Sequence, residues 1–268
     1  MKIVFNKTLL FLCLFSHAAV ISAQNKETLV IAHRAGAAFA PENSISAVLI
    51  ALNSDAQCIE VDVRMTSDSV LVLMHDKKIN RTTYGKGHLK NMTYDELCNF
   101  KLKGIHDSLP DKVPTLEDIF NTVNKKKTLV LEIKKHRTNP QGIEQQLVSL
   151  IQEHNAHDWC VVHSFSDKVL GNIYRLDSNV RLNKLLFAGS SCLPLVIDHT
   201  LRFKSLKKYK YIEDFSIHHL FASRRIIRKL HALNKKVNVW TVNKERRAQK
   251  LFRRGADGII TDNLILKK

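Results

Sequence analysis

Several pairs of reactive side chains lie at the ends of apolar runs in the sequence. His33 and Arg34 close one such run, and Glu60 and Asp62 lie two residues apart within the next. Side chains two residues apart on a β-strand point to the same face, so both carboxylates are expected to face inward together. Burying two carboxylates in one place is costly unless a cation balances them. The spacing therefore indicates a site that holds positive charge.

A second set of such residues follows further along the chain. His75 and Asp76 end a short apolar run, and Glu132 and Lys134 lie two residues apart at the end of another. Each has an ordinary structural explanation. A lone histidine at the end of a strand is often a structural residue with satisfied hydrogen bonds, and Glu132 with Lys134 can be a simple ion pair. Their shared position at strand ends favours a functional site instead.

Three carboxylates without clustered cysteines or histidines favour a hard divalent cation, Mg²⁺ or Ca²⁺. The predicted metal ligands are Glu60, Asp62 and Glu132. The histidines are then left for proton transfer, and the basic residues for neutralising phosphate oxygens. The candidates for these two tasks are His33 with His75, and Arg34 with Lys134. The set suits chemistry at a phosphate group.

Short β-branched or apolar runs alternate with longer helical patterns along most of the chain. The predicted strands are 28–34, 58–65, 128–134, 160–165, 180–187, 211–217, 236–242 and 257–261. The predicted helices between most of them are 44–54, 115–123, 142–155, 167–176, 223–233 and 244–253. Eight strands alternating with helices over about 250 residues predict an α/β fold, the TIM (β/α)8 barrel. A doubly wound open sheet is the alternative that the pattern leaves open.

A further apolar run, 70–75, starts only four residues after the second predicted strand ends. A parallel crossover needs about a dozen residues or more, so the two runs are expected to form an antiparallel β-hairpin. Pairing Met65 with Val70 would place Glu60 opposite His75. The hairpin would thus return a histidine to the carboxylates of the second strand.

The chain divides into a targeting segment and one domain. Two lysines precede an apolar run, 8–23, which ends in small residues before a polar stretch. This pattern predicts a cleaved signal peptide over 1–23 and an exported protein, periplasmic or secreted; a membrane anchor is the less favoured alternative. The domain then spans 24–268, with residues 77–112 as a small insertion after the hairpin, because they show no strong periodicity.

Composition narrows the possible partners. The 268 residues include 42 Lys and Arg against 25 Asp and Glu, which gives a net charge of +17. This excess favours anionic partners such as phosphoesters or an anionic membrane surface. No nucleic-acid partner is expected, since no recognition module for one is present. Of the cysteines in the domain, Cys58 and Cys160 open strand-like runs and are expected to be buried thiols.

Ordered motifs along nearly the whole domain resemble the glycerophosphodiester phosphodiesterase family. The motifs are His33-Arg34-Ala35-Gly36, Pro41-Glu42-Asn43, Ile59-Glu60-Val61-Asp62-Val63, Met74-His75-Asp76, Arg81-Thr82-Thr83, Val113-Pro114-Thr115, Leu131-Glu132-Ile133-Lys134, Val239-Trp240-Thr241 and Gly255-Ala256-Asp257-Gly258. Any one motif is weak evidence, but the ordered set is specific. One departure lies at Ala35, where the family usually has glycine.

The resemblance implies a TIM barrel that hydrolyses glycerophosphodiesters to glycerol phosphate and an alcohol with the help of a divalent cation. It implies that Glu60, Asp62 and Glu132 bind the metal and that His33 and His75 are the acid and base. Arg34 and Lys134 match positions near the phosphate. The remaining implied residues are Glu42 and Asn43 as support, Trp240 as a wall of the alcohol pocket or as barrel packing, and, more weakly, Phe165.

Two other functions fit parts of the same pattern. One is a phospholipase-type phosphodiesterase or lyase that acts on intact lipid, and the other is a non-catalytic barrel that binds anionic ligands. The products of the reaction, and the need for a metal, distinguish these from glycerophosphodiester hydrolysis. The sequence leaves open whether the nucleophile is a substrate hydroxyl or water, and which histidine is the acid.

Overall fold

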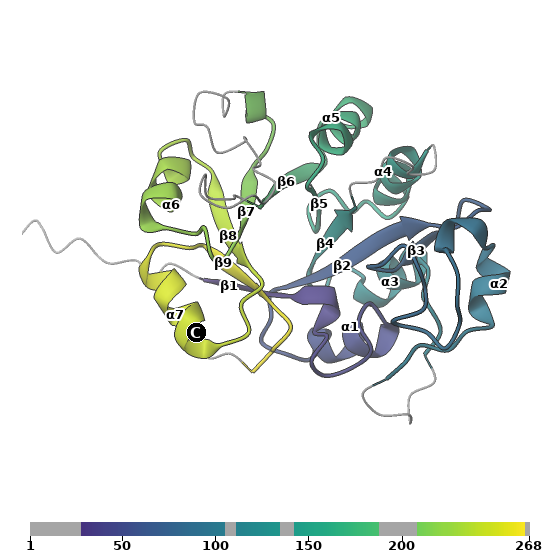
Figure 1. Cartoon of the computed structure of the whole chain (residues 1–268). Helices are drawn as coiled ribbons and strands as arrows, with labels where there is room; N and C mark the ends of the chain where they lie inside the picture. Colours follow the sequence, from purple (N-terminus) through teal and green to yellow (C-terminus); the bar gives the residue numbers. More distant parts are fainter. Residues whose placement is uncertain (1–27, 105–110, 135–141, 188–207, 266–268) are drawn as a thin grey trace, which may run out of the picture.

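The structure, a computed structural model, describes residues 28–104, 111–134, 142–187 and 208–265, and eight parallel strands in them form a closed ring. The ring consists of β1 (Leu29–Ala32), β2 (Cys58–Met65), β4 (Thr128–Ile133), β5 (Cys160–Ser164), β6 (Arg181–Leu186), β7 (Asp214–His218), β8 (Lys236–Trp240) and β9 (Gly258–Thr261). Because β1 pairs with both β2 and β9, the sheet has no free end there. The predicted TIM barrel is confirmed, and the open sheet is excluded (Figure 1).

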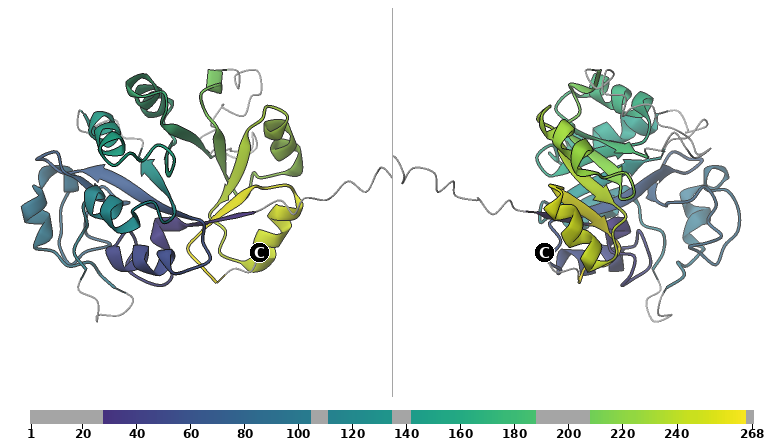
Figure 2. Two further views of the ribbon diagram at one scale, coloured as in Figure 1. Left: turned by 180° about the vertical axis from the view of Figure 1, so that it is seen from behind. Right: turned by 60° about the vertical axis from the view of Figure 1, so that its left-hand side comes forward.

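Helices pack around the outside of the ring (Figures 1 and 2). They are α1 (Ile45–Leu52), α3 (Leu116–Val123), α4 (Ile143–Glu153), α5 (Asp167–Leu176), α6 (Arg224–His231) and α7 (Glu245–Arg253). Several begin where the sequence supplies an N-cap, since a hydroxyl accepts a hydrogen bond from an otherwise unpaired N–H group of the first turn. These caps are Ser44, Thr115, Ser166 and Ser223. The predicted helices agree with these within a few residues at their ends.

Apolar residues alternate between two cores on the barrel strands. On β2, Ile59, Val61 and Val63 pack outward against the helices. The inward positions form a smaller cluster inside the ring: Ile31, Cys58, Val130, Val161 and Ile260. This alternation leaves Glu60 and Asp62 on the inner face, as their spacing predicts, and it buries the thiols of Cys58 and Cys160. Cys192 lies outside the described residues.

The predicted hairpin is present, but its predicted register is wrong by one residue. Strand β3 (Leu71–Leu73) pairs antiparallel with β2, and Met65 lies opposite Leu71 instead of Val70. The reason is the turn: Thr66 donates its N–H to the carbonyl of Val70 around a three-residue loop whose last residue, Ser69, has a φ of 69°. A left-handed residue at that position is typical of three-residue hairpin loops. His75 therefore does not lie opposite Glu60.

Residues after β3 form a small lobe at one side of the barrel (Figure 1). It contains the short helix α2 (Tyr94–Cys98), where Thr93 and Glu96 form a capping box. Its own apolar cluster consists of Val72, Met74, Ile79, Leu89, Leu97, Leu102 and Val113. This cluster holds together a segment that the sequence pattern left without periodicity.

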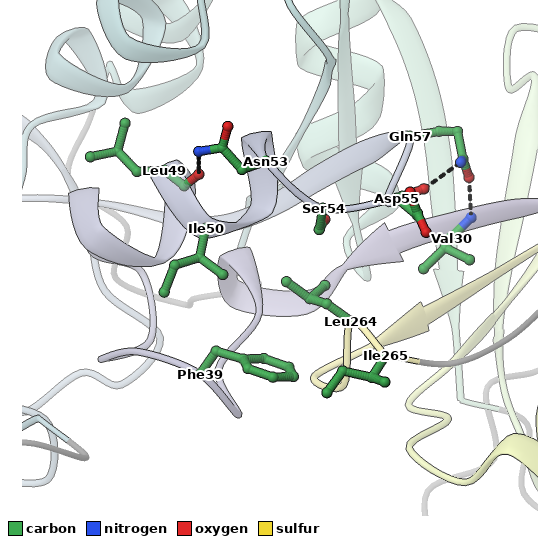
Figure 3. Close-up of a pocket in the computed structure, with 10 residues that line it drawn as sticks. All are labelled: Val30, Phe39, Leu49, Ile50, Asn53, Ser54, Asp55, Gln57, Leu264 and Ile265. Carbon is green, nitrogen blue, oxygen red and sulfur yellow. Dashed lines mark hydrogen bonds between the residues drawn. The ribbon is translucent and has the colours of Figure 1, made fainter.

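A shallow pocket of 980 Å³ lies on the outside of the barrel, between α1, β1 and the residues after β9 (Figure 3). Its lining includes Phe39, Leu49, Ile50 and Leu264 but none of the predicted site residues. In the described part of the chain no helix is long and apolar enough to cross a membrane. The predicted signal peptide, 1–23, lies outside the described residues and stays a prediction.

Gly258 offers a test of how tightly the barrel interior is filled. A Cβ atom at this position would lie 2.5 Å from Oδ1 of Asn238 and 3.3 Å from the carbonyl oxygen of Leu29. We expect Gly258→Ala to lower the free energy of unfolding by about 1–3 kcal/mol, the usual cost of overpacking a core. Urea denaturation followed by circular dichroism measures this.

Gly171 provides the matched control. It lies within α5, and the nearest atom to its added Cβ would be the Tyr211 hydroxyl at 3.9 Å. Because alanine is the better helix former, Gly171→Ala is expected to raise stability by about 0.5–1 kcal/mol. Equal effects of the two substitutions would contradict the tight contact at Gly258.

Candidate active site

The chain turns sharply as it leaves β1, and this turn reaches the carboxylates of β2. His33, Arg34 and Ala35 form a single 3-10 turn in which Arg34 and Ala35 have φ values of 49° and 62°. Such left-handed conformations are unfavourable for residues with a side chain and are retained where surrounding contacts fix them. Here the backbone N–H of Arg34 donates to Oε2 of Glu60 at 2.8 Å.

The three predicted metal ligands converge inside the C-terminal end of the barrel. Glu60 and Asp62 come from β2 and Glu132 from the neighbouring strand β4, where it lies opposite Asp62 in the ladder. All three are buried. Parallel strands that end at the same rim bring these side chains together, as is typical of barrel enzymes.

Lys134 and Arg34 balance part of this negative charge. Nζ of Lys134 lies 2.6 Å from Oδ1 of Asp62 and 2.8 Å from Oε2 of Glu132. Nε of Arg34 lies 3.6 Å from Oδ2 of Asp62. Burial raises the pKa of Asp62, but the charge of Lys134 and other nearby cations outweighs it and holds that pKa well below its usual range. Asp62 is therefore ionised.

Asn43 fixes the position of Asp62 from a neighbouring loop. Its Nδ2 donates to Oδ2 of Asp62 at 2.9 Å, and its Oδ1 accepts from the backbone N–H of Asp62 at 2.9 Å. Asn43 adopts a φ of 58° to do so. This two-point contact matches the supporting position predicted for Asn43.

A chain of ion pairs links the lobe to the barrel. Arg81 donates from Nη1 and Nη2 to both oxygens of Glu42, at 2.7 and 2.8 Å, and from Nε to Asp76 at 2.6 Å. Glu42 also accepts from Nη1 of Arg34. Asp76 in turn lies 2.7 Å from Nδ1 of His75. The lobe thus helps to orient both His75 and Arg34.

His33 has a carboxylate partner of its own. Its Nδ1 lies 2.6 Å from Oδ1 of Asp262, the residue directly after β9. Asn243 Nδ2 donates to the other oxygen of Asp262 at 2.6 Å. Because a carboxylate only accepts hydrogen bonds, the proton resides on Nδ1, which leaves Nε2 to gain or lose one.

The two histidines differ in how readily they hold a second proton. Burial lowers the pKa of His33, but the hydrogen bond to Asp262 and the charge of Glu60 outweigh it, so the pKa is raised. Burial also lowers the pKa of His75, and there the nearby carboxylates do not reverse the shift. Opposite pKa shifts in a pair of titratable groups are typical of an acid and a base that act together.

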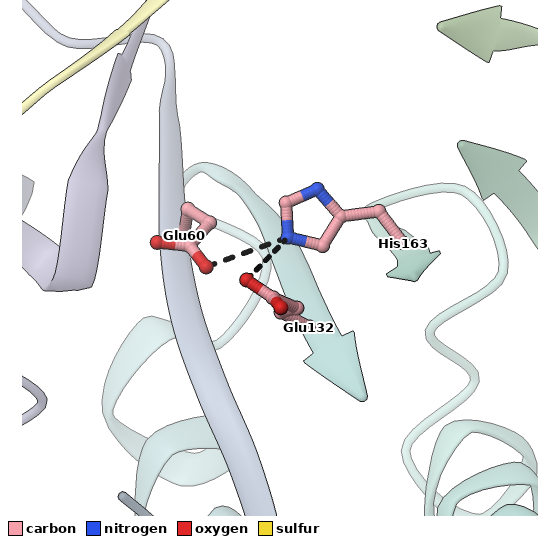
Figure 4. A group of neighbouring side chains, drawn as sticks. All are labelled: Glu60, Glu132 and His163. Carbon is pink, nitrogen blue, oxygen red and sulfur yellow. Dashed lines mark hydrogen bonds and ion pairs between the residues drawn. The ribbon is translucent and has the colours of Figure 1, made fainter. Parts of the chain in front are cut away.

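A third histidine, His163 on β5, lies against the carboxylates. Its Nε2 is 3.4 Å from Oε1 of Glu60 and 3.9 Å from Oε2 of Glu132 (Figure 4). One ligand atom from each of these three residues falls within 4.8 Å of the others, a spacing that fits a shared metal ion. Asp62 is outside this group of three and is held by Lys134 and Asn43.

The donor set fits a divalent cation on electrostatic grounds as well. Oε1 of Glu132 is buried without a hydrogen-bond partner. Burial, together with the repulsion from Asp62 and Glu60, raises the pKa of Glu132 despite Lys134. A cation bound beside Glu132 would supply the missing partner and favour the ionised form.

Trp240 lies at the C-terminal end of β8, half-buried over the inner barrel cluster. Its ring meets that of Phe165 edge to face, with centroids 5.5 Å apart, and that of His218 at 4.9 Å. Its Nε1 donates to the carbonyl of Ser216 at 3.0 Å. Trp240 therefore packs in the barrel and also adjoins Phe165, the weaker pocket candidate; their role at the alcohol stays a prediction.

Comparison with known proteins identifies the family. The sequence profile of the glycerophosphoryl diester phosphodiesterase family matches residues 33–266. The chain belongs to this family. The resemblance predicted from the motifs is confirmed, and with it the enzyme class.

Individual glycerophosphodiester phosphodiesterases align over most of the chain. The protein is 31% identical to the glycerophosphodiester phosphodiesterase of Caldanaerobacter subterraneus subsp. tengcongensis over 88% of this chain and 95% of that protein. A glycerophosphodiester phosphodiesterase structure from Parabacteroides distasonis is 27% identical, with a TM-score of 0.72 and coverage of 88% and 93%. An Oleispira antarctica phosphodiesterase, solved with the product sn-glycerol-3-phosphate, shares the fold at 23% identity and a TM-score of 0.74, with coverage of 87% and 92%.

Three residues of this phosphodiesterase site were not predicted as site residues. Asp262 and His163 each lie at or near the C-terminal end of a barrel strand, and Arg81 lies in the lobe. Val161 and His163 lie two residues apart on β5 and share its inner face, and this spacing on the strand that follows Glu132 is the signal that would have found His163. Asp262 meets His33 only because the barrel closes, and nothing in the local sequence indicates that contact.

Asp262→Asn tests the coupling between Asp262 and His33. Replacing the carboxylate by a neutral amide removes the negative charge that stabilises the protonated imidazole. The pKa of His33 is therefore expected to fall, so that half-protonation occurs at a lower pH. A pH titration of the histidine ring signals by NMR measures the change.

Asp177→Asn is the matched control, since Asp177 pairs with His157 at 2.9 Å outside the barrel mouth. It should leave the titration of His33 as it is in the unaltered protein. An unchanged His33 titration in Asp262→Asn would contradict the assigned role of Asp262.

Proposed function

We propose that the protein hydrolyses glycerophosphodiesters to glycerol phosphate and an alcohol with the help of a bound divalent cation. The observation that carries this proposal is the convergence of Glu60, Asp62 and Glu132 at a barrel mouth flanked by two histidines, each paired to an aspartate. Family membership supports the same reaction. The product held by the Oleispira antarctica relative is a glycerol phosphate, which agrees with the proposed substrate class.

The cation would be held by the buried carboxylates, and their oxygens suit Mg²⁺ or Ca²⁺. When bound, it neutralises charge that develops on the phosphate oxygens. Arg34 and Lys134 are proposed to share this task. Both have basic groups at the buried carboxylates, so a phosphate that approaches the cation also meets them.

Proton transfer is assigned to His33 and His75. Asp262 holds Nδ1 of His33 and Asp76 holds Nδ1 of His75, so in each ring Nε2 is the nitrogen that exchanges a proton. One ring removes the proton of the nucleophile, a substrate hydroxyl or water, and the other protonates the departing alcohol. Their opposite pKa shifts allow one ring to be neutral while the other is protonated.

Removal of the metal tests the first half of the mechanism. Treatment with EDTA is expected to abolish hydrolysis of glycerophosphocholine, and added Mg²⁺ or Ca²⁺ should restore it. Glu60→Gln should prevent this restoration, because the neutral amide is a poorer ligand for a hard cation. Glu117→Gln, at an exposed position of α3, is the control and should behave like the unaltered protein. Full activity after chelation would argue against a metal-dependent reaction.

Loss of either histidine tests the second half. His33→Ala and His75→Ala are each expected to lower kcat by about 10²–10⁴, the usual contribution of acid–base catalysis. His157→Ala, which alters a histidine paired with Asp177 away from the site, should leave kcat unchanged. Chromatography of the products distinguishes glycerol phosphate from a cyclic phosphate or diacylglycerol, which a lyase or phospholipase would release. Near-normal rates in His33→Ala or His75→Ala would remove the proton-transfer assignment.

A further inference from the structure

His163 lies deeper in the barrel than the predicted acid and base, and its side chain is only 2% exposed. On β5 it is flanked in the ladder by Glu132 of β4 and Asn183 of β6. Its ring points between Glu60 and Glu132, with Nε2 directed at both carboxylates (Figure 4). Neither the acid–base pair nor the phosphate-binding residues make use of this side chain.

The distances from Nε2 are unusual for a histidine beside carboxylates. The other histidine–carboxylate pairs among the described residues are 2.6, 2.7, 2.9 and 2.7 Å long. Those have the length of charge-assisted hydrogen bonds, whereas the hydrogen bond from His163 to Glu60 is long, at 3.4 Å, and the 3.9 Å contact with Glu132 is an ion pair only. Two ligand atoms that are each about 2.1 Å from one ion can be up to about 4.2 Å apart. Both spacings therefore lie within the range that coordination of one shared ion allows.

His163 also borders a polar part of the barrel interior. Nδ1 of His163 is buried and has no hydrogen-bond partner in the described structure. His163 lines a cavity of 230 Å³ together with Asn183, Ser216 and Asn238, whose side-chain oxygens are likewise buried without partners. An imidazole that binds metal through Nε2 carries its proton on Nδ1, and that N–H requires an acceptor. Water in this cavity can connect that N–H to these oxygens.

We propose that Nε2 of His163 is a ligand of the divalent cation held by Glu60 and Glu132, which gives the site a nitrogen donor beside its carboxylates. The assignment rests on the proposed metal-dependent function. Mg²⁺ and Ca²⁺ prefer oxygen ligands, whereas imidazole favours transition-metal ions such as Mn²⁺ and Zn²⁺. His163 accordingly sets the ion preference of the site and raises the affinity for Mn²⁺ relative to Ca²⁺.

Pulsed electron paramagnetic resonance of the Mn²⁺-loaded protein tests this directly. An imidazole nitrogen bound to Mn²⁺ gives a ¹⁴N coupling, which should be present in the unaltered protein. It should be lost in His163→Gln and retained in His157→Gln. If His163→Gln does not fold, absence of a ¹⁴N coupling in the unaltered protein still overturns the assignment.

Calorimetric titrations with Mn²⁺ and with Ca²⁺ provide the second readout. The ratio of the Ca²⁺ Kd to the Mn²⁺ Kd is expected to fall by about 10-fold or more in His163→Gln, a scale on which loss of even an indirect partner affects metal affinity. His157→Gln should retain the ratio of the unaltered protein.

The outcomes separate this assignment from the proposed function. Tight Mn²⁺ binding without a ¹⁴N coupling, or an unchanged ion preference in His163→Gln, would overturn the role of His163 and leave metal-dependent hydrolysis intact. If no divalent ion binds and hydrolysis survives chelation, the metal-dependent reaction itself fails, and His163 has no ion to bind.

Discussion

Burial of three carboxylates in one barrel mouth is the constraint on which the rest of the site depends. Glu60, Asp62 and Glu132 lose their hydration, and each must regain equivalent interactions from the protein or from an ion. Lys134 contacts two of them, and the backbone N–H of Arg34 contacts the third. Glu132 remains the least compensated, as its raised pKa indicates. This surplus of negative charge is the basis of the proposed cation site, and through the cation of the proposed binding of a phosphate.

The closed barrel lowers the free-energy cost of burying these charges. Strands that are remote in the sequence end at one rim, where their side chains pair with one another. Asp262 and His33 are 229 residues apart, yet the pairing of β9 with β1 places them in contact. His163 lies beside Glu132 because the consecutive strands β4 and β5 pair in parallel. Backbone strain occurs at two residues that make these contacts. Arg34 and Asn43 both adopt left-handed conformations, and each donates a hydrogen bond, Arg34 to Glu60 and Asn43 to Asp62.

The sequence was most informative where a strand's alternation carries the signal. Glu60 and Asp62 could be placed inside the barrel because their apolar neighbours alternate with them, and the closed fold followed from the regular succession of strands and helices. The predicted hairpin register was wrong because the register depends on the left-handed φ of Ser69. A serine at this position does not by itself indicate a positive φ. Helix α2 was missed although Thr93 and Glu96 form a capping box, because five residues give too short a period to detect. The contact of Asp262 with His33 depends on the pairing of β9 with β1, which only the closed ring supplies, whereas the place of His163 follows from the pairing of the consecutive strands β4 and β5.

The inner face of the barrel is divided in a way that follows from the same electrostatics. Ile31, Val130 and Val161 fill one side, whereas Asn183, Ser216 and Asn238 line the other. Glycine at position 258 leaves the space that the Asn238 amide occupies. The packing of the neighbouring strand therefore accommodates a polar side chain here. Polar groups buried without partners are costly, and a barrel needing only stability would be better filled with aliphatic side chains. These oxygens line the same cavity as His163, and under the proposed coordination through Nε2 the proton on Nδ1 requires an acceptor there.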